Sequence, residues 1–213
     1  MTIRVLVADD QAMIRGALAG LLDLERDIEV VAQAADGAQA LDELARLASA
    51  DAPARASAPI DVAIIDVEMP RMDGITATQA IRSRFPGVRV LIVTTFGRPG
   101  YLQRALDAGA TGFIVKDAPV ETLVEGVRTV AAGGRAIDQN LALEALAAGS
   151  SPLTDREADV LHEVEGGGTI ADIAHSLHLS QGTVRNHVSS AMLKMNARTR
   201  AEAASLARAA GWL

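Results

Sequence analysis

Short apolar runs alternate with amphipathic segments along the first two thirds of the chain. Residues 3–8 (IRVLVA) form an apolar run rich in β-branched residues, which is typical of a buried parallel strand. The next segment repeats apolar residues at a spacing of about 3.6, which indicates a helix with one buried face. The same alternation predicts strands at 29–34, 62–66, 88–94 and 112–115, and helices at 13–22, 38–47, 75–84, 100–108 and 120–131.

Five consecutive strand–helix units predict an α/β fold, a doubly wound five-stranded parallel sheet covered by helices. In such a sheet, ligands bind beyond the carboxyl ends of the strands. Polar residues stand at these ends in four of the predicted strands: Asp9 and Asp10, Asp66, Thr94, and Lys116. The sequence therefore predicts one polar site at this edge of the sheet.

The last 60 or so residues follow a different pattern, with helical periodicity at 154–165, 170–177, 181–195 and 200–210. The break at 178–180 leaves room only for a tight turn, which is the spacing of a helix-turn-helix. We expect a first domain at 1–132, a linker at 133–152 and an all-α four-helix domain at 153–213. The segment 48–59 (ASADAPARASAP) is predicted to be a surface insertion, and no function is assigned to it.

The amino-acid composition excludes several kinds of site and indicates one kind of partner. The chain contains no cysteine, which excludes disulfides and thiolate metal sites and is compatible with a cytoplasmic location. Neither the N-terminus nor any other stretch is apolar enough for a signal peptide or a membrane span, so no membrane insertion is expected. The net charge is −7, yet residues 173–201 carry no acid and include Arg185, Lys194, Arg198 and Arg200. This local basic surface favours nucleic acid as a partner.

The residue types at the predicted sheet edge suit phosphoryl chemistry. Three carboxylates close together repel one another unless a cation lies between them, and Mg²⁺ is the first choice for oxygen ligands. Lys116 supplies a positive charge and Thr94 a hydroxyl donor, both suited to phosphoryl oxygens. A carboxylate such as that of Asp66 can itself accept a phosphoryl group.

Four separated motifs carry a family resemblance: VADD at 7–10, IIDVEMPRMDG at 64–74, Thr94, and FIVKD at 113–117. Together they resemble the receiver domain of two-component response regulators over residues 1–131. The resemblance implies that Asp66 is the phosphoacceptor and that Thr94 and Lys116 contact the phosphoryl oxygens. It also implies a Mg²⁺ site formed by Asp10, by Asp66, by Asp9 acting mainly through water, and by the backbone carbonyl of Glu68. Phe113 matches the aromatic switch position, and a plain core aromatic is the alternative.

The C-terminal segment from Leu153 to Ala207 resembles the LuxR-type helix-turn-helix of the NarL/FixJ family. The resemblance is carried by Ile173-Ala174, Leu179-Ser180, Thr183-Val184-Arg185-Asn186-His187 and Lys194-Met195. Thr154 and Glu157 also form a capping-box pattern, which predicts the start of a helix. The segment 94–101 (TTFGRPGY) is similar to the DesR-like branch of the family.

The helix predicted at 181–195 separates a buried stripe from a polar face. Arg185, Asn186 and Ser189 project together and are expected to read bases in the major groove. Phosphate contacts are expected from Ser180, Gln181, Thr183 and Lys194. Gly166-Gly167-Gly168 and Ala171 depart from the family pattern and place backbone contacts from the preceding helix in doubt. A solvated helix in a protein-interaction bundle is the alternative.

These features predict a response regulator, not an enzyme. A sensor histidine kinase would phosphorylate Asp66, and the chain would form a homodimer through the surface around Tyr101–Phe113 or through the first helix. The dimer would bind double-stranded promoter DNA and control transcription. Two alternatives remain: a phosphohydrolase with Asp66 as nucleophile and Glu68 as proton donor, and a constitutive DNA-binding protein whose first domain only dimerises.

Overall fold

The computed structural model describes residues 2–50, 58, 60–95, 97–149 and 151–213. The chain forms two compact units. The first lies within residues 1–97 and 102–142, and the second comprises residues 143–213 together with the short segment 98–101. The predicted linker at 133–152 thus spans the division between the two units.

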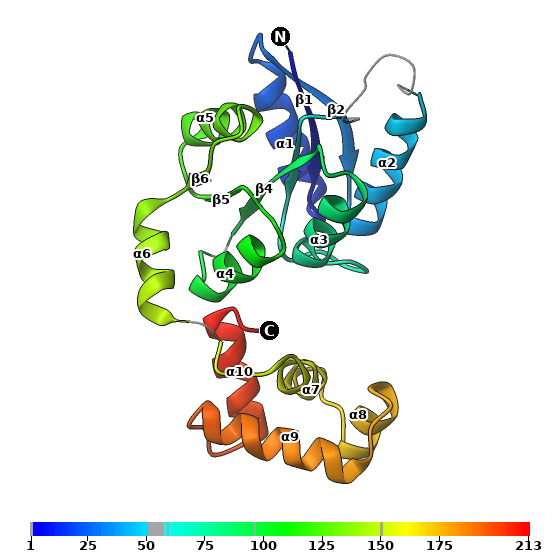
Figure 1. Cartoon of the computed structure of the whole chain (residues 1–213), viewed down its shortest axis with the longest axis vertical. Coiled ribbons are helices and arrows are strands. Elements are labelled where there is room, and N and C mark those ends of the chain that lie inside the picture. Colours follow the sequence, from blue (N-terminus) through cyan, green and yellow to red (C-terminus); the bar gives the residue numbers. More distant parts are fainter. Residues whose placement is uncertain (1, 51–57, 59, 96, 150) are drawn as a thin grey trace. The chain divides into compact units, whose positions relative to one another are not determined.

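The first unit is built on a parallel sheet whose strands lie in the order β2-β1-β3-β4-β5-β6 (Figure 1). All neighbouring strands pair in parallel, as the alternation of strands and helices predicts. The strands are β1 (Ile3–Ala8), β2 (Ile28–Ala34), β3 (Val62–Ile65), β4 (Arg89–Thr94), β5 (Gly112–Val115) and β6 (Ala136–Ile137).

Helices connect successive strands of this sheet and cover it (Figure 1). They are α1 (Ala12–Asp23), α2 (Gly37–Ala50), α3 (Gly74–Arg84), α4 (Pro99–Asp107) and α5 (Val120–Ala131). The doubly wound α/β prediction is therefore confirmed, and each predicted helix and strand of this unit is present within a few residues of its expected ends.

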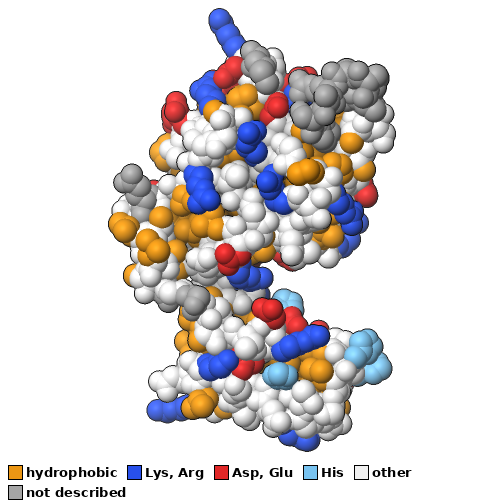
Figure 2. Space-filling view, in the orientation of Figure 1, with side chains coloured by type: hydrophobic (Ala, Val, Ile, Leu, Met, Phe, Trp, Pro, Cys, Tyr) orange, Lys and Arg blue, Asp and Glu red, His pale blue; other side chains and the backbone are white. Residues whose placement is uncertain are grey.

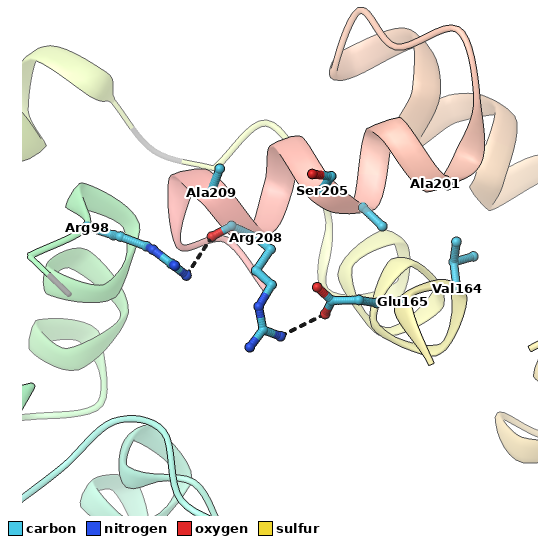
Figure 3. Close-up of a pocket in the computed structure, with 8 residues that line it drawn as sticks. Arg98, Val164, Glu165, Ala201, Ser205, Arg208 and Ala209 are labelled. Atoms are coloured by element: carbon cyan, nitrogen blue, oxygen red, sulfur yellow. Dashed lines mark hydrogen bonds and ion pairs between the residues drawn. The ribbon is translucent and has the colours of Figure 1, made fainter. Parts of the chain in front are cut away.

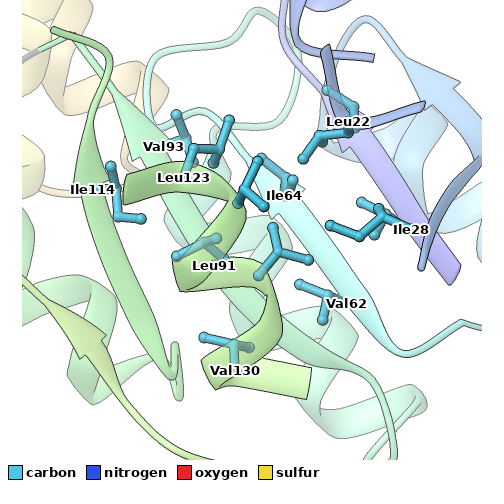
Figure 4. Packing of buried hydrophobic residues seen from close by; sticks show 13 residues of the cluster. Leu22, Ile28, Val62, Ile64, Leu91, Val93, Ile114, Leu123 and Val130 are labelled. Carbon is cyan, nitrogen blue, oxygen red and sulfur yellow. The ribbon is translucent and has the colours of Figure 1, made fainter. Parts of the chain in front are cut away.

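Alternate residues of the central strands pack against α1 and α5 and form one cluster of the core (Figure 4). Val62 and Ile64 of β3 and Leu91 of β4 lie in this cluster beside Leu22 of α1 and Val130 of α5. Each fully buried aliphatic side chain of this kind contributes about 1.5–3 kcal/mol. Because the strands are buried on both faces, their sequences are continuous apolar runs, which makes them recognisable from the sequence.

One difference from the expected five-stranded sheet lies at its edge. Ala136 and Ile137 pair with Gly112 and Phe113 as a sixth strand, and helix α6 (Gln139–Ala148) follows. A strand of two residues is too short to produce an alternating pattern, so it cannot be predicted from the sequence. Of the predicted insertion at 48–59, the first residues complete α2, and residues 51–57 and 59 lie outside the described part of the chain.

The second unit contains α7 (Asp155–Glu165), α8 (Ile170–Ser176), α9 (Gln181–Lys194) and α10 (Arg200–Ala210). Apolar residues of all four helices form one core, among them Val160, Ile173, Val184 and Ala203. An ion pair of 2.8 Å between Arg208 of α10 and Glu165 at the end of α7 lies at its surface (Figure 3). The four-helix prediction is confirmed.

No helix in the described part of the chain is both long enough and apolar enough to cross a membrane.

Candidate functional site

The polar residues predicted at the strand ends meet at one edge of the sheet. Asp9 and Asp10 directly follow β1, Asp66 follows β3, Thr94 ends β4 and Lys116 follows β5. These four strands are neighbours in the sheet. Backbone hydrogen bonds between neighbouring strands fix the relative positions of these ends. The Asp66 amide donates to the Ala8 carbonyl at 2.9 Å, and the Lys116 amide donates to the Thr94 carbonyl at 2.8 Å.

Lys116 bridges two buried carboxylates at this edge. Its ammonium nitrogen lies 2.7 Å from Asp66 Oδ2 and 2.7 Å from Asp9 Oδ2. Burial lowers the pKa of Lys116, but the contacts of its ammonium with the Asp66 and Asp9 carboxylates outweigh burial and raise that pKa. Burial raises the pKa of Asp66, and the bond from Lys116 opposes this rise without cancelling it. The site therefore holds an ammonium beside the Asp66 carboxylate, whose ionisation burial makes costly.

The geometry of the carboxylates fits a hard metal ion. One oxygen from each of Asp9, Asp10 and Asp66 lies within 4.8 Å of the other two. Within the described residues, Asp9 Oδ2 is buried and makes no hydrogen bond of normal geometry, although Lys116 is close. Three carboxylates beside one ammonium leave an excess of negative charge. Oxygen ligands with such an excess are what divalent cations bind in proteins.

The other predicted site residues occupy different surroundings. Thr94 is buried at the end of β4, between the strands that carry Asp66 and Lys116. Glu68 is half-buried, two residues after Asp66. Phe113 is completely buried within β5, so its ring already serves as a core residue, and its role as a switch stays a prediction.

The loop after Asp66 has a tightly defined path. Asp66 Oδ1 accepts a hydrogen bond from the amide of Val67 at 2.7 Å, and the amide of Gly74 donates to the Val67 carbonyl at 2.9 Å. A Cβ atom at Gly74 would lie 1.8 Å from the Asp66 carbonyl oxygen, so no other residue fits there without a shift of the backbone. Asp73 caps α3 by accepting hydrogen bonds from the amides of Ile75 and Thr76. Asp73 and Gly74 thus shape the turn.

Sequence reasoning missed one basic residue near the acids. Arg15 of α1 donates a hydrogen bond of 2.6 Å to the backbone carbonyl of Asp9 and thereby holds the end of β1. The apolar positions of this segment predict the helix but do not indicate a polar side chain that turns back toward the strand.

The second unit presents the polar face that was predicted for the recognition helix. Arg185, Asn186 and Ser189 of α9 are exposed, whereas Val184, Val188 and Ala191 are buried. Ser180 caps α9 by accepting a hydrogen bond of 3.0 Å from the Thr183 amide, and Gln181 and Ser180 are exposed beside it. Figure 2 shows basic and histidine side chains among acidic ones on one face of this unit.

Lys194 has a partner that the sequence did not reveal. Its ammonium lies 2.6 Å from Oε2 of Glu157, a buried carboxylate of α7 that also accepts hydrogen bonds from Ser190 at 2.6 Å and from the Thr154 amide at 2.7 Å. Burial opposes the charge of Glu157, but the bonds from Lys194, Ser190 and Thr154 lower its pKa to about 2. Lys194 therefore joins α9 to α7, and its predicted phosphate contact stays a prediction.

The two departures from the family pattern lie at the start of α8, since Gly166-Gly167-Gly168 precede this helix and Ala171 is its second residue. Gly167 adopts a φ of +83°, which favours glycine, and a capping box of Thr169 and Asp172 begins the helix. Hydrogen bonds from Thr169 lower the pKa of Asp172. An ionised Asp172 in the first turn is unfavourable for a DNA phosphate at that helix end, in keeping with the weak backbone contacts expected there.

Both units match known protein families. Residues 5–128 match the response regulator receiver domain, and residues 151–207 match the family described as bacterial regulatory proteins of the luxR family. Apart from residues 98–101, the first match lies in the first compact unit, and the second match lies in the second unit.

Known proteins match almost the whole length of the chain. The uncharacterized transcriptional regulatory protein YvfU of Bacillus subtilis (strain 168) is 39% identical over 99% of this chain and 100% of that protein. The transcriptional regulatory protein DesR of the same strain is 38% identical over 99% of this chain and 98% of that protein. Among solved structures, that of ChrA, a response regulator in a heme-sensing two-component system, has 31% identity and a TM-score of 0.55, covering 97% of this chain and 96% of ChrA.

The Glu157 network predicts acid-sensitive stability of the second unit. The pKa of Glu157 is lowered from an ordinary 4.5 to about 2, so its stabilising effect is complete above pH 4.5 and disappears as the pH falls toward 2. At pH 7, Glu157→Gln should lower the free energy of unfolding of this unit by roughly 2 kcal/mol, and the difference from wild type should shrink as the pH falls from 4.5 toward 2.

The fluorescence of Trp212, the single tryptophan, follows urea unfolding of this unit. Asp159→Asn on the same helix is the control, because Asp159 makes only an exposed pair with Arg156. If Glu157→Gln destabilised the unit equally at pH 7 and at pH 3, the ionised carboxylate of Glu157 would not be the source of the stability.

Proposed function

Because this chain belongs to the two-component response regulators that join a receiver domain to a LuxR-type helix-turn-helix, we propose that Asp66 accepts a phosphoryl group from a sensor histidine kinase. The chain is a transcriptional regulator with a DNA-binding domain, and the family consists of regulators, which are not enzymes. Membership in it argues against the phosphohydrolase alternative. The observation that supports Asp66 most is its placement beside Lys116 and Asp9 at the sheet edge.

The proposed reaction uses the carboxylate of Asp66 as nucleophile. One of its oxygens forms a bond to the phosphorus of a phosphohistidine as the P–N bond breaks, and the released imidazole takes a proton from water. Asp9, Asp10, Asp66 and the carbonyl of Glu68 would hold Mg²⁺, which supplies positive charge to the phosphoryl oxygens. Lys116 would exchange its bond with Asp66 for one with a phosphoryl oxygen, and Thr94 would donate its hydroxyl proton.

Phosphorylation then favours one of two conformations that already exist in equilibrium. The new charge draws Thr94 at the end of β4 and Lys116 at the end of β5 toward Asp66. Phe113 lies on β5, three residues before Lys116, so a shift of this strand end reaches the ring directly. Its predicted switch role requires that the ring, now fully buried, leave its present packing.

Of the two surfaces predicted for dimerisation, the first helix is better suited to a protein contact, because it exposes large apolar side chains. Met13 is 85% exposed and Leu24, just after α1, is 77% exposed. Gly16 and Gly20 on the same helix have open space where a Cβ would stand, which leaves a flat surface. In the alternative region the large apolar side chains Leu102 and Phe113 are buried. We infer that a second copy of this chain docks on α1 after phosphorylation.

The dimer would present two copies of α9 to the major groove of promoter DNA. Arg185 and Asn186 are exposed and suited to guanine and adenine edges, with Ser189 beside them. Arg185 contacts Gln181 at 3.3 Å, a weak bond that DNA can replace. Ser180, Gln181 and Thr183 stand at the N-terminus of the same helix, where phosphates are favoured.

Asp66→Ala should abolish phosphorylation. Incubated with acetyl phosphate and Mg²⁺, the wild-type protein should gain the mass of one phosphoryl group in intact mass spectrometry, and the variant should gain none. Asp107→Ala changes an exposed acid of α4 and should behave as wild type. If Asp66→Ala also bound promoter DNA in cells as wild type does, the constitutive alternative would be favoured.

Met13→Glu should prevent dimerisation without affecting phosphorylation, because two like charges would face each other across the contact. Light scattering of the phosphorylated proteins gives the masses, with a dimer expected for wild type and a monomer for the variant. Leu143→Glu places the same charge on an exposed leucine of α6 and serves as the control. A phosphorylated Met13→Glu dimer would assign the contact to another surface.

Arg185→Ala should weaken specific DNA binding by roughly 1–3 kcal/mol. Fluorescence anisotropy at fixed salt measures the binding affinity for two duplexes. One duplex is selected from a random pool by the phosphorylated wild-type protein, and the other is a scrambled version of it. Arg156→Ala removes an exposed arginine of α7 and should retain the preference. If Arg185→Ala weakened binding to both duplexes equally, Arg185 would be a phosphate contact and not a base reader.

A further inference from the structure

A buried carboxylate outside the acidic site stands at the turn between β2 and α2. Asp36 is 1% exposed, and its Oδ1 accepts a hydrogen bond of 2.9 Å from the amide of Gln39 at the start of α2. A buried carboxylate is costly unless its charge has a partner. None of the phosphoryl chemistry described above uses this residue.

The partner of Asp36 comes from the loop that carries the phosphoacceptor. The guanidinium of Arg71 makes an ion pair with Asp36 Oδ2, although the Arg71 side chain is 69% exposed. A second link joins the same two segments, since the amide of Gly37 donates to the carbonyl of Met72 at 3.1 Å. A Cβ at Gly37 would lie 2.9 Å from that carbonyl oxygen, so the approach is close.

These links hold the loop in a conformation that it does not favour by itself. Arg71 has a φ of +62°, in the left-handed region that is unfavourable for a residue other than glycine. The base of the loop is already fixed by the bond between Gly74 and Val67. The bonds of Arg71 and Met72 to the β2–α2 turn fix its far end, so the path from Asp66 to Gly74 is held at both ends.

We propose that Asp36 and Arg71 are positioning residues for the metal site, acting through the loop that bears Asp66 and the carbonyl of Glu68. The ion pair keeps these oxygens at the separation from Asp9 and Asp10 that one cation requires, and so sets the affinity for Mg²⁺. This inference rests on the proposed function, because it assumes that Mg²⁺ binds at the three carboxylates.

The sign of the effect separates positioning from simple electrostatics. Arg71 is a positive charge on the same loop as a cation site, so Coulomb's law alone predicts that its removal tightens Mg²⁺ binding. Loss of positioning predicts the reverse, because ligands that must be reordered bind more weakly.

The test is a Mg²⁺ titration of the unphosphorylated full-length protein, followed by the NMR shifts of the Asp10 and Val67 amides. Arg71→Ala should raise the dissociation constant roughly tenfold, the lower end for residues that orient ligands from outside. Arg46→Ala is the matched control, since Arg46 is 60% exposed and pairs with Glu43 within α2. Its affinity should equal that of wild type.

Asp36→Asn tests the other member of the pair, and the double variant should add little to either single change. An unchanged or tighter Mg²⁺ affinity in Arg71→Ala would overturn the inference while leaving the proposed function intact. Wild-type protein that bound no Mg²⁺ at these amides would overturn both. The Arg71 variant keeps the result interpretable if Asp36→Asn does not fold, because Arg71 lies largely in solvent.

Discussion

Two buried carboxylates share one ammonium at the carboxyl edge of the sheet, and the rest of the receiver domain is arranged around this contact. Asp9 and Asp66 come from adjacent strands, so the parallel pairing of β1 with β3 sets their separation. Lys116 arrives from β5, across β4, and reaches both. The negative charge that remains explains why a divalent cation fits, and the Lys116 ammonium is the positive partner already in place for an incoming phosphoryl group.

Each supporting contact fixes a segment next to the acidic residues. Arg15 holds the backbone of Asp9, Gly74 allows α3 to start against the Asp66 carbonyl, and Arg71 reaches the buried Asp36. The DNA-binding domain uses the same device, since Glu157 is buried and joins Lys194 of α9 to the start of α7. In each domain one charged pair fixes the segment on which the proposed function depends. Arg71 and Asp36 fix the loop that follows Asp66, and Lys194 and Glu157 fix α9.

Much of this arrangement could be predicted from the sequence because its signals are local. The strands are unbroken apolar runs, and strand ends in a parallel sheet must meet at one edge, so Asp9, Asp66, Thr94 and Lys116 could be grouped without a structure. Strand β6 could not be predicted, because two residues carry no period. The pairs Arg71–Asp36 and Lys194–Glu157 were missed for another reason: each joins residues more than 30 positions apart, and each partner looks like an ordinary surface charge in its own segment.

The identity of the phosphorylated residue is the point on which the function depends, and it can be measured directly. Borohydride reduces an aspartyl phosphate to homoserine, which tandem mass spectrometry locates in a peptide digest of the phosphorylated protein. We predict homoserine at position 66 and aspartate at positions 9 and 10. Homoserine at either of those two positions, or at no aspartate of the receiver domain, would contradict the assignment of Asp66 as the phosphoacceptor.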